Sequence, residues 1–116
     1  MSNSFRDLLV WQRAIQMSLA IYRLTSGFPK EELYGLTSQI RRAGVSVASN
    51  VAEGYGRLST GEYKQFLGMA RGSNSEVQTQ LVIARELGYG NQQVLHEAES
   101  LSFEVGKMLL AILRKL

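Results

Sequence analysis

The sequence predicts an all-α protein, a single domain over residues 1–116 folded as an antiparallel up-down-up-down four-helix bundle. One proline is present, and the β-branched residues do not gather into the alternating runs that predict a sheet. Four long segments repeat apolar residues every three or four positions, which is the spacing of a buried helical stripe. Short links join segments of similar length, and that arrangement favours antiparallel neighbours with shallow crossing angles. A chain of 116 residues has the usual size of one domain.

The first helix is expected over residues 7–26. Ser4 and Asp7 have the spacing of a capping pair, and Gly27 is a natural stop because glycine accepts the left-handed conformation of a helix C-cap. We expect Phe28, in the following turn, to fold back onto the bundle. The buried stripe of this helix should be Val10, Ala14, Met17, Ile21 and Leu24, widened by Trp11, Ile15, Leu19 and Tyr22.

The second helix is expected over residues 36–57 and carries two stripes. The apolar stripe should face the core and consists of Leu36, Ile40, Ala43, Val47 and Val51. The polar stripe follows the same helical spacing along another face and consists of Ser46, Asn50, Glu53 and Arg57. Gly54 and Gly56 weaken the end of this helix and allow the backbone to bend or another chain to come close.

The third helix is expected over residues 60–87 and the fourth over residues 92–115. Ser59 and Glu62 match a capping box, and Asn91 is a good N-cap for the fourth helix. The stripe of the third helix should be Leu67, Ala70, Asn74, Val77, Leu81 and Ala84. The stripe of the fourth should be Val94, Ala98, Leu101, Val105, Met108 and Ile112, broadened by Leu95, Leu109, Leu113 and Leu116. Gly68 and Gly72 lie one turn apart and predict a groove against which a neighbouring helix packs.

Composition limits the class of protein. The formal net charge is +3, with seven Lys or Arg against four acids in residues 1–58 and six against six in residues 59–116. This modest excess permits contact with nucleic acid without requiring it. The chain has no cysteine, which excludes disulfides and thiolate chemistry and agrees with a cytoplasmic location. We expect no signal peptide and no membrane span, since no apolar run approaches the roughly 20 residues that a span needs.

Residues suited to catalysis are scarce. His96 is the one histidine, and its place near a helix start beside Glu97 is typical of a surface residue. Without a second histidine or a cysteine, we expect no transition-metal site, no cofactor and no enzymatic activity. Residues 54–56, Gly-Tyr-Gly, lack the lysine and the preceding strand of a phosphate-binding loop.

A family resemblance that extends over almost the whole chain rests on five motifs: Trp11-Gln12-x-Ala14, residues 28–32 (FPKEE), residues 34–43 (YGLTSQIRRA), residues 50–57 (NVAEGYGR) and Thr79-Gln80-Leu81. On these motifs the chain resembles the bacterial four-helix-bundle proteins encoded within intervening sequences of large-subunit ribosomal RNA genes. The accessory protein of diversity-generating retroelements looks related to the same family. The resemblance implies an antiparallel four-helix subunit and a homopentameric ring. For the accessory-protein branch it also implies binding to nucleic acid or to a reverse transcriptase.

The polar stripe has two interpretations. It is a hydrogen-bonded seam between helices or subunits, with partners expected from Glu76, Thr79 and Gln80, or it is a site for a ligand or partner. A half-buried seam of this kind would fix register and subunit number. We therefore assign the predicted oligomer interface to Ser46, Asn50, Glu53, Gly68 and Gly72.

Nucleic-acid binding is assigned to Arg41, Arg42 and Arg57. Arg41 and Arg42 point about 100° apart on a helix, so they cannot grip one phosphate as a single fork. A ring of identical subunits would repeat each arginine around its axis, so the small positive charge of one chain would become a larger phosphate-binding surface. Alternatively, these arginines form salt bridges between subunits. Four aromatic residues could stack on bases or belong to the core: Trp11, Tyr22, Tyr34 and Tyr55.

Two functions follow from these assignments. The first is a non-enzymatic, homo-oligomeric bundle that binds RNA or DNA. The alternative is a structural or adaptor module that binds another protein, such as a reverse transcriptase.

Overall fold

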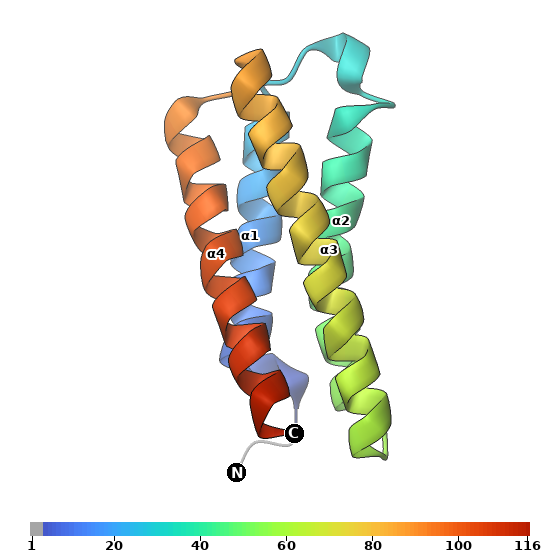
Figure 1. Ribbon diagram of the computed structural model, residues 1–116. Helices are drawn as coiled ribbons and strands as arrows, with labels where there is room; N and C mark the ends of the chain where they lie inside the picture. The colour runs from blue at the N-terminus through green and yellow to red at the C-terminus, as the bar shows by residue number, and fades with distance from the viewer. Residues whose placement is uncertain (1–3) are drawn as a thin grey trace.

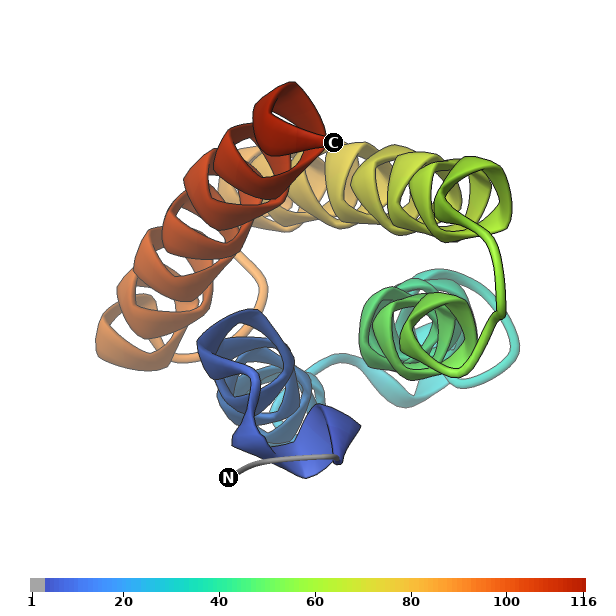
Figure 2. The same ribbon diagram turned by 90° about the horizontal axis from the view of Figure 1, so that it is seen from below.

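The structure is a computed structural model that describes residues 4–116, and it confirms the four-helix bundle (Figure 1). Viewed along its axis, the bundle places each helix at one corner and in contact with the helices before and after it, while α4 closes the ring onto α1 (Figure 2). Residues 4–116 contain no strand. The long helices are α1 (Leu9–Thr25), α2 (Leu36–Tyr55), α3 (Thr60–Leu87) and α4 (Gln92–Lys115), and two short 3-10 helices are η1 (Phe5–Asp7) and η2 (Lys30–Glu32).

Helix ends follow the local chemistry of the chain. The predicted bounds of α3 and α4 are confirmed, but α1 begins at Leu9 because Leu8 is extended, with ψ 124°. Ser4 caps η1 instead, where its hydroxyl accepts a hydrogen bond from the Arg6 amide at 3.1 Å. The second helix ends at Tyr55, two residues earlier than predicted, since the Arg57 amide bonds back to the Gly54 carbonyl in a tighter turn.

The caps predicted for α3 and α4 form. Ser59 Oγ accepts a hydrogen bond from the Glu62 amide at 3.2 Å, and the same hydroxyl donates to Glu62 Oε1 at 3.2 Å. Asn91 Oδ1 accepts from the amides of Gln93 and Val94. Gly88 closes α3 in the left-handed conformation, with φ 72°, which an L side chain would strain.

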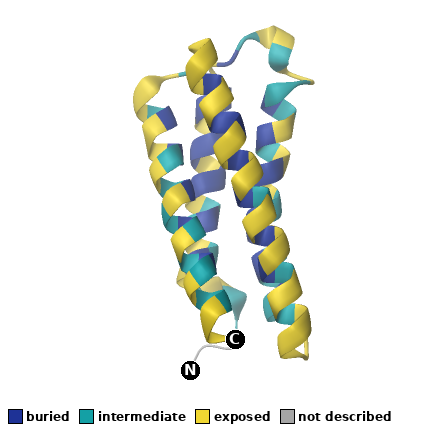
Figure 3. Cartoon of the chain, in the orientation of Figure 1, coloured by how far each residue is buried: buried dark blue, intermediate teal, exposed yellow. Residues whose placement is uncertain are grey.

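The core lies along the inward faces of all four helices (Figure 3). The central stripe predicted for α1 and the stripe predicted for α3 are fully buried, and that of α2 is buried apart from the half-buried Leu36. Of the residues expected to widen the α1 stripe, Trp11 and Ile15 are half-buried, whereas Leu19 and Tyr22 are exposed, which corrects the prediction for those two. The stripe predicted for α4 is rotated: its buried residues are Leu95, Ala98, Ser102, Val105 and Leu109. Leu101 and Met108 are only half-buried, because α4 turns its face towards α3 as well as α1.

A polar pair explains part of that rotation. Ser102 on α4 is fully buried, and its hydroxyl donates to Asn74 Oδ1 on α3 at 2.8 Å. Asn74 Nδ2 donates to the Ser102 carbonyl at 2.9 Å. A pattern of apolar residues cannot include a buried serine, so the sequence placed the centre of the α4 stripe too far towards α1.

The turn between α1 and α2 packs as predicted. Phe28 is buried, and its ring lies 5.4 Å from that of Tyr89 in the α3–α4 turn. The Tyr89 hydroxyl donates to Glu32 Oε2 at 3.1 Å. This hydrogen bond, and after it burial, raises the pKa of Tyr89 above its ordinary value. Among the described residues, no helix has the length and apolar character needed to cross a membrane.

Candidate nucleic-acid interface

A surface groove lies between α1 and α2 at the end of the bundle where η2 sits. It encloses about 610 Å³ and is lined by Tyr22, Leu33, Tyr34, Thr37, Ser38, Arg41, Arg42 and Val45, and we call it the α1–α2 groove. Tyr34 projects from the turn before α2 and is 92% exposed, and Tyr22 is 44% exposed. No acidic residue lines the groove. The structure therefore brings two of the predicted arginines together with two of the predicted aromatics.

Arg41 is held in place by α1. Its Nε donates to Thr25 Oγ1 at 2.7 Å, and its guanidinium carbon lies 4.6 Å from the centroid of the Tyr22 ring. Thr25 in turn donates to the Ile21 carbonyl at 2.8 Å, which fixes the acceptor. These contacts use one N–H and one face of the guanidinium group, and its terminal nitrogens remain free to donate into the groove.

Arg42 is exposed, and within residues 4–116 it makes no ion pair or hydrogen bond. Although Arg41 and Arg42 leave the helix about 100° apart, both side chains line the same groove. They offer two separate cationic contacts along one surface.

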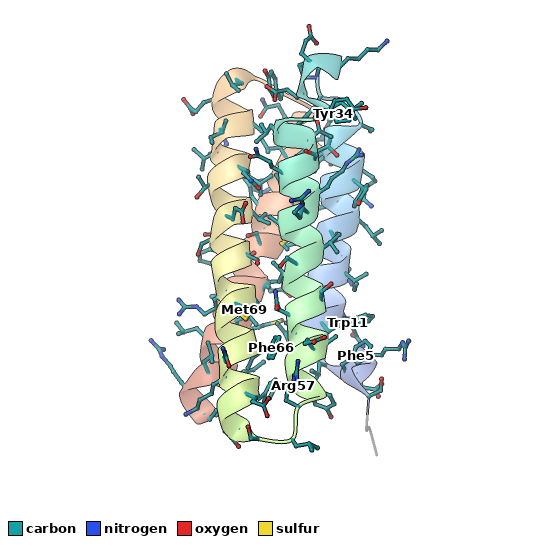
Figure 4. All side chains as sticks on the ribbon, turned by 90° about the vertical axis from the view of Figure 1, so that its right-hand side faces the viewer. Phe5, Trp11, Tyr34, Arg57, Phe66 and Met69 are labelled. Atoms are coloured by element: carbon teal, nitrogen blue, oxygen red, sulfur yellow. The ribbon has the colours of Figure 1, made fainter. Side chains whose placement is uncertain are left out.

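Arg57 lies at the other end of α2. Fifteen residues separate it from Arg42, or about 22 Å along a helix, and Figure 4 places Arg57 and Tyr34 at opposite ends of the molecule. Its guanidinium pairs with Glu53 at 3.0 Å, approaches Glu62 at 3.9 Å, and stacks 4.7 Å from the centroid of the Phe66 ring. The structure does not bring Arg57 together with the other two predicted nucleic-acid residues.

The polar stripe of α2 forms a hydrogen-bonded seam with α3 inside one chain. Ser46 Oγ lies 2.9 Å from Ser73 Oγ, and Asn50 Nδ2 donates to both the carbonyl and the hydroxyl of Ser46. This agrees with the interpretation of the stripe as a seam between helices. Its predicted role between subunits, for Ser46, Asn50 and Glu53, stays a prediction.

For the seam inside one chain, the predicted partners Glu76, Thr79 and Gln80 were wrong. Thr79 donates to the Ser75 carbonyl of its own helix, and Gln80 Nε2 donates to Glu76 at 3.3 Å. The antiparallel register places Ser46 beside Ser73, so Gln80 lies about two turns further along α3. The Oε1 atom of Gln80 is buried there without a hydrogen-bond partner among the described residues.

The glycines singled out in α2 and α3 differ in how much space surrounds them. A Cβ on Gly54 would lie 2.8 Å from Phe66 Cβ, so it is α3 of the same chain that comes close to this part of α2. Burial, and after it the nearby Tyr55, raises the pKa of Tyr63 beside this contact. Gly68 and Gly72 instead face open space: no atom lies within 4 Å of a Cβ at either position. The groove predicted there for a neighbouring helix is absent within the chain, and their place in an oligomer interface stays a prediction.

An apolar hollow continues the α1–α2 groove towards the opposite end of the two helices. It encloses about 230 Å³, shares Val45 with the groove, and is lined by Trp11, Ile15, Ser18, Val45, Ala48, Ser49 and Ala52. The Phe5 ring meets Trp11 edge-on, with the ring centroids 5.2 Å apart. Val45 was not predicted as a surface-site residue. The sequence feature that could have identified it is an apolar side chain that lies outside the buried stripe of α2.

Residues 4–116 contain no group of three or more His, Asp or Glu side chains that could hold a metal ion. His96 is exposed on the first turns of α4, as predicted.

The chain is similar to one protein family and to solved structures with the same fold. The family model described as 23S rRNA-intervening sequence protein matches residues 6–111. A solved structure from Bacteroides thetaiotaomicron VPI-5482, titled as a protein with unknown function from the S23 ribosomal protein family, superposes with a TM-score of 0.80. The two sequences are 19% identical, and the match covers 90% of this chain and 98% of that one, which shows a shared fold. No curated protein matches. The match over residues 6–111 shows that this chain belongs to the 23S rRNA-intervening sequence protein family.

Proposed function

We propose that this protein is a non-enzymatic, self-associating helical bundle that binds RNA or DNA in the α1–α2 groove. The observation that carries the proposal is the meeting of Arg41, Arg42, Tyr22 and Tyr34 in one open groove without an acid. Proteins that bind single-stranded nucleic acid combine cations that follow the backbone with aromatic rings on which bases stack. The proposed ligand is therefore a single strand, held by charge and stacking.

Each arginine has a distinct part in this proposal. Arg42 is exposed and unpaired within residues 4–116, so it contacts phosphate directly. Arg41, fixed by Thr25 and Tyr22, positions its remaining N–H groups at the floor of the groove. Tyr34 supplies the stacking surface because it is the most exposed aromatic ring of the groove.

Self-association would multiply these contacts. One chain carries a formal charge of +3, so five copies would carry 5 × 3, or +15. The apolar residues exposed on the outside of α3, among them Met69 at 49% and Ile83 at 44%, and the open Gly68 and Gly72 support assembly through that helix (Figure 4). The proposed assembly is the homopentamer that the family resemblance implies.

Fluorescence anisotropy with a labelled single-stranded oligonucleotide tests the binding proposal. The affinity should fall steeply as salt rises, and R42E should both weaken binding and make the salt dependence shallower. K115E, which makes the same change of charge outside the groove, is the matched control. Equal losses in R42E and K115E, or no binding at low salt, would refute the proposal.

Light scattering tests self-association separately. The native protein should have several times the 12.9 kDa mass of one chain. G72L should reduce that mass by overpacking the contact, while S100L, which places the same leucine side chain at an exposed position of α4, should not. A native protein that stays at the mass of one chain at every concentration would exclude the assembly.

The apolar hollow favours one alternative function. Its lining of Trp11, Ile15, Val45 and small residues suits a protein helix better than a strand of nucleic acid. An adaptor that binds another protein, such as a reverse transcriptase, would use this surface. Because Arg42 does not line the hollow, the R42E variant would still bind that partner.

A further inference from the structure

The helices α3 and α4 lie on the side of the bundle opposite α1 and α2 (Figure 2). A second groove is lined by residues of α3 and α4. It encloses about 230 Å³, and we call it the α3–α4 groove. No acidic residue lines it. Its polar and aromatic side chains come from both helices: Arg71, Asn74 and Gln78 from α3, and Phe103 and Lys107 from α4.

The floor of this groove is a notch at Gly106. A Cβ on Gly106 would lie 3.2 Å from Asn74 Nδ2 and 3.8 Å from Gln78 Nε2, so both amide nitrogens border the space that the missing side chain leaves. Asn74 Nδ2 gives one hydrogen to the Ser102 carbonyl and keeps a second one. Gln78 makes no side-chain hydrogen bond within residues 4–116. The notch therefore presents N–H donors.

The rim of the groove is cationic because the acids of α4 are paired elsewhere: Glu97 with Arg23, Glu99 with Arg85 and Glu104 with Arg13. Arg71 and Lys107 have no acidic partner within residues 4–116. Lys64 precedes Arg71 by seven residues and Arg114 follows Lys107 by seven, so each extends the same helical face by two turns. Residues 59–116 contain equal numbers of basic and acidic residues, but the surface around this groove is basic.

We propose that the α3–α4 groove binds a nucleotide. The phosphate takes hydrogen bonds from Arg71, Lys107 and the amide groups at the notch, and the base stacks on Phe103. Phe103 is 63% exposed, and the Lys107 ammonium already lies 5.2 Å from the centroid of its ring, which brings the phosphate-binding cation next to the stacking surface.

The size of the groove decides which part of the nucleotide it encloses. About 230 Å³ is below the roughly 300–1,000 Å³ of pockets that enclose a whole small ligand. The groove therefore encloses the phosphate and part of the sugar and leaves the base outside against Phe103. Because no residue of the α1–α2 groove takes part, this inference and the proposed function can fail independently.

Two-dimensional ¹H–¹⁵N NMR of the full chain, titrated in parallel with AMP, adenosine and inorganic phosphate, tests the inference. AMP should shift the Gly106 amide and the Asn74 side-chain amide, and should bind at least ~10-fold more tightly than phosphate because of stacking. R71E and K107E should each weaken AMP binding by ~10-fold or more, whereas K30E, the same change of charge on η2, should leave it unchanged. F103L should reduce AMP to the affinity of phosphate.

Specific results would overturn the inference. Equal binding of AMP and phosphate by the native protein would exclude stacking on Phe103, and an equal loss in K30E and R71E would exclude a local site. If R71E does not fold, G106A tests the notch without changing charge, and unchanged AMP binding there would exclude the proposal. A single-stranded tetranucleotide titrated in the same way should shift the same amides, and whether it or AMP binds more tightly identifies a strand or a free nucleotide as the natural ligand.

Discussion

Replacing Ser102 with alanine would leave the Oδ1 atom of Asn74 inside the bundle without its hydrogen-bond donor. Asn74 is 3% exposed and Ser102 is 0% exposed, so water cannot substitute easily for the lost hydroxyl. A buried acceptor without a donor costs about 1–3 kcal/mol of folding free energy. With an unfolding entropy of about 2.1 cal/mol/K per residue, or roughly 0.24 kcal/mol/K for 116 residues, a loss of about 2 kcal/mol lowers the Tm by about 8 °C.

A double-mutant cycle isolates the pair from other effects of the substitution. N74L alone should also destabilise the protein, because it removes both hydrogen bonds between Asn74 and Ser102. The combination of N74L and S102A leaves no side-chain polar atom unpaired at this contact, so its cost should be smaller than the sum of the two by about 1 kcal/mol or more. S100A, an exposed serine on the same helix, measures the gain in helix propensity that any serine-to-alanine change brings.

Urea unfolding followed by circular dichroism, at several protein concentrations, provides these free energies. Varying the concentration separates folding from self-association. The reasoning is refuted if S102A differs from S100A by less than about 0.5 kcal/mol, or if the two single substitutions simply add.

Two further expectations concern the glycines and the alkaline pH range. G54A should destabilise the chain by about 1–3 kcal/mol because its Cβ would lie 2.8 Å from Phe66 Cβ, whereas G72A, which meets open space, should stabilise the helix by up to about 1 kcal/mol. Thermal melts that rank the two variants the other way would contradict this. The raised pKa of Tyr89 means that the folded state holds this proton more tightly than the unfolded chain. The stability that native protein has over Y89F should therefore be complete below about pH 10 and fall above it, and a difference that does not change with pH would show that the Glu32 contact is absent in solution.

The sequence by itself determined the four long helices and the central buried stripes of α1, α2 and α3, but not that of α4. The bounds of α3 and α4 follow from caps at Ser59 and Asn91 and from the stop at Gly88, each of which depends on a few neighbouring residues. The buried stripes of α1 and α3 follow from spacing along one helix. These features are local, because backbone hydrogen bonds, caps and helical periodicity involve residues within about four positions of one another.

Only the tertiary structure decided which side chains meet between helices. It placed Ser46 beside Ser73 instead of Gln80, rotated α4 so that Ser102 is buried, and separated Arg57 from the groove that contains Arg42. It also paired the glutamates of α4 with arginines of α1 and α3, leaving Arg71 and Lys107 unpaired in a stretch where charges balance by count. The physical reason is that register and rotation between helices depend on contacts between residues far apart in the chain, and a change of one residue in either brings a different set of side chains together.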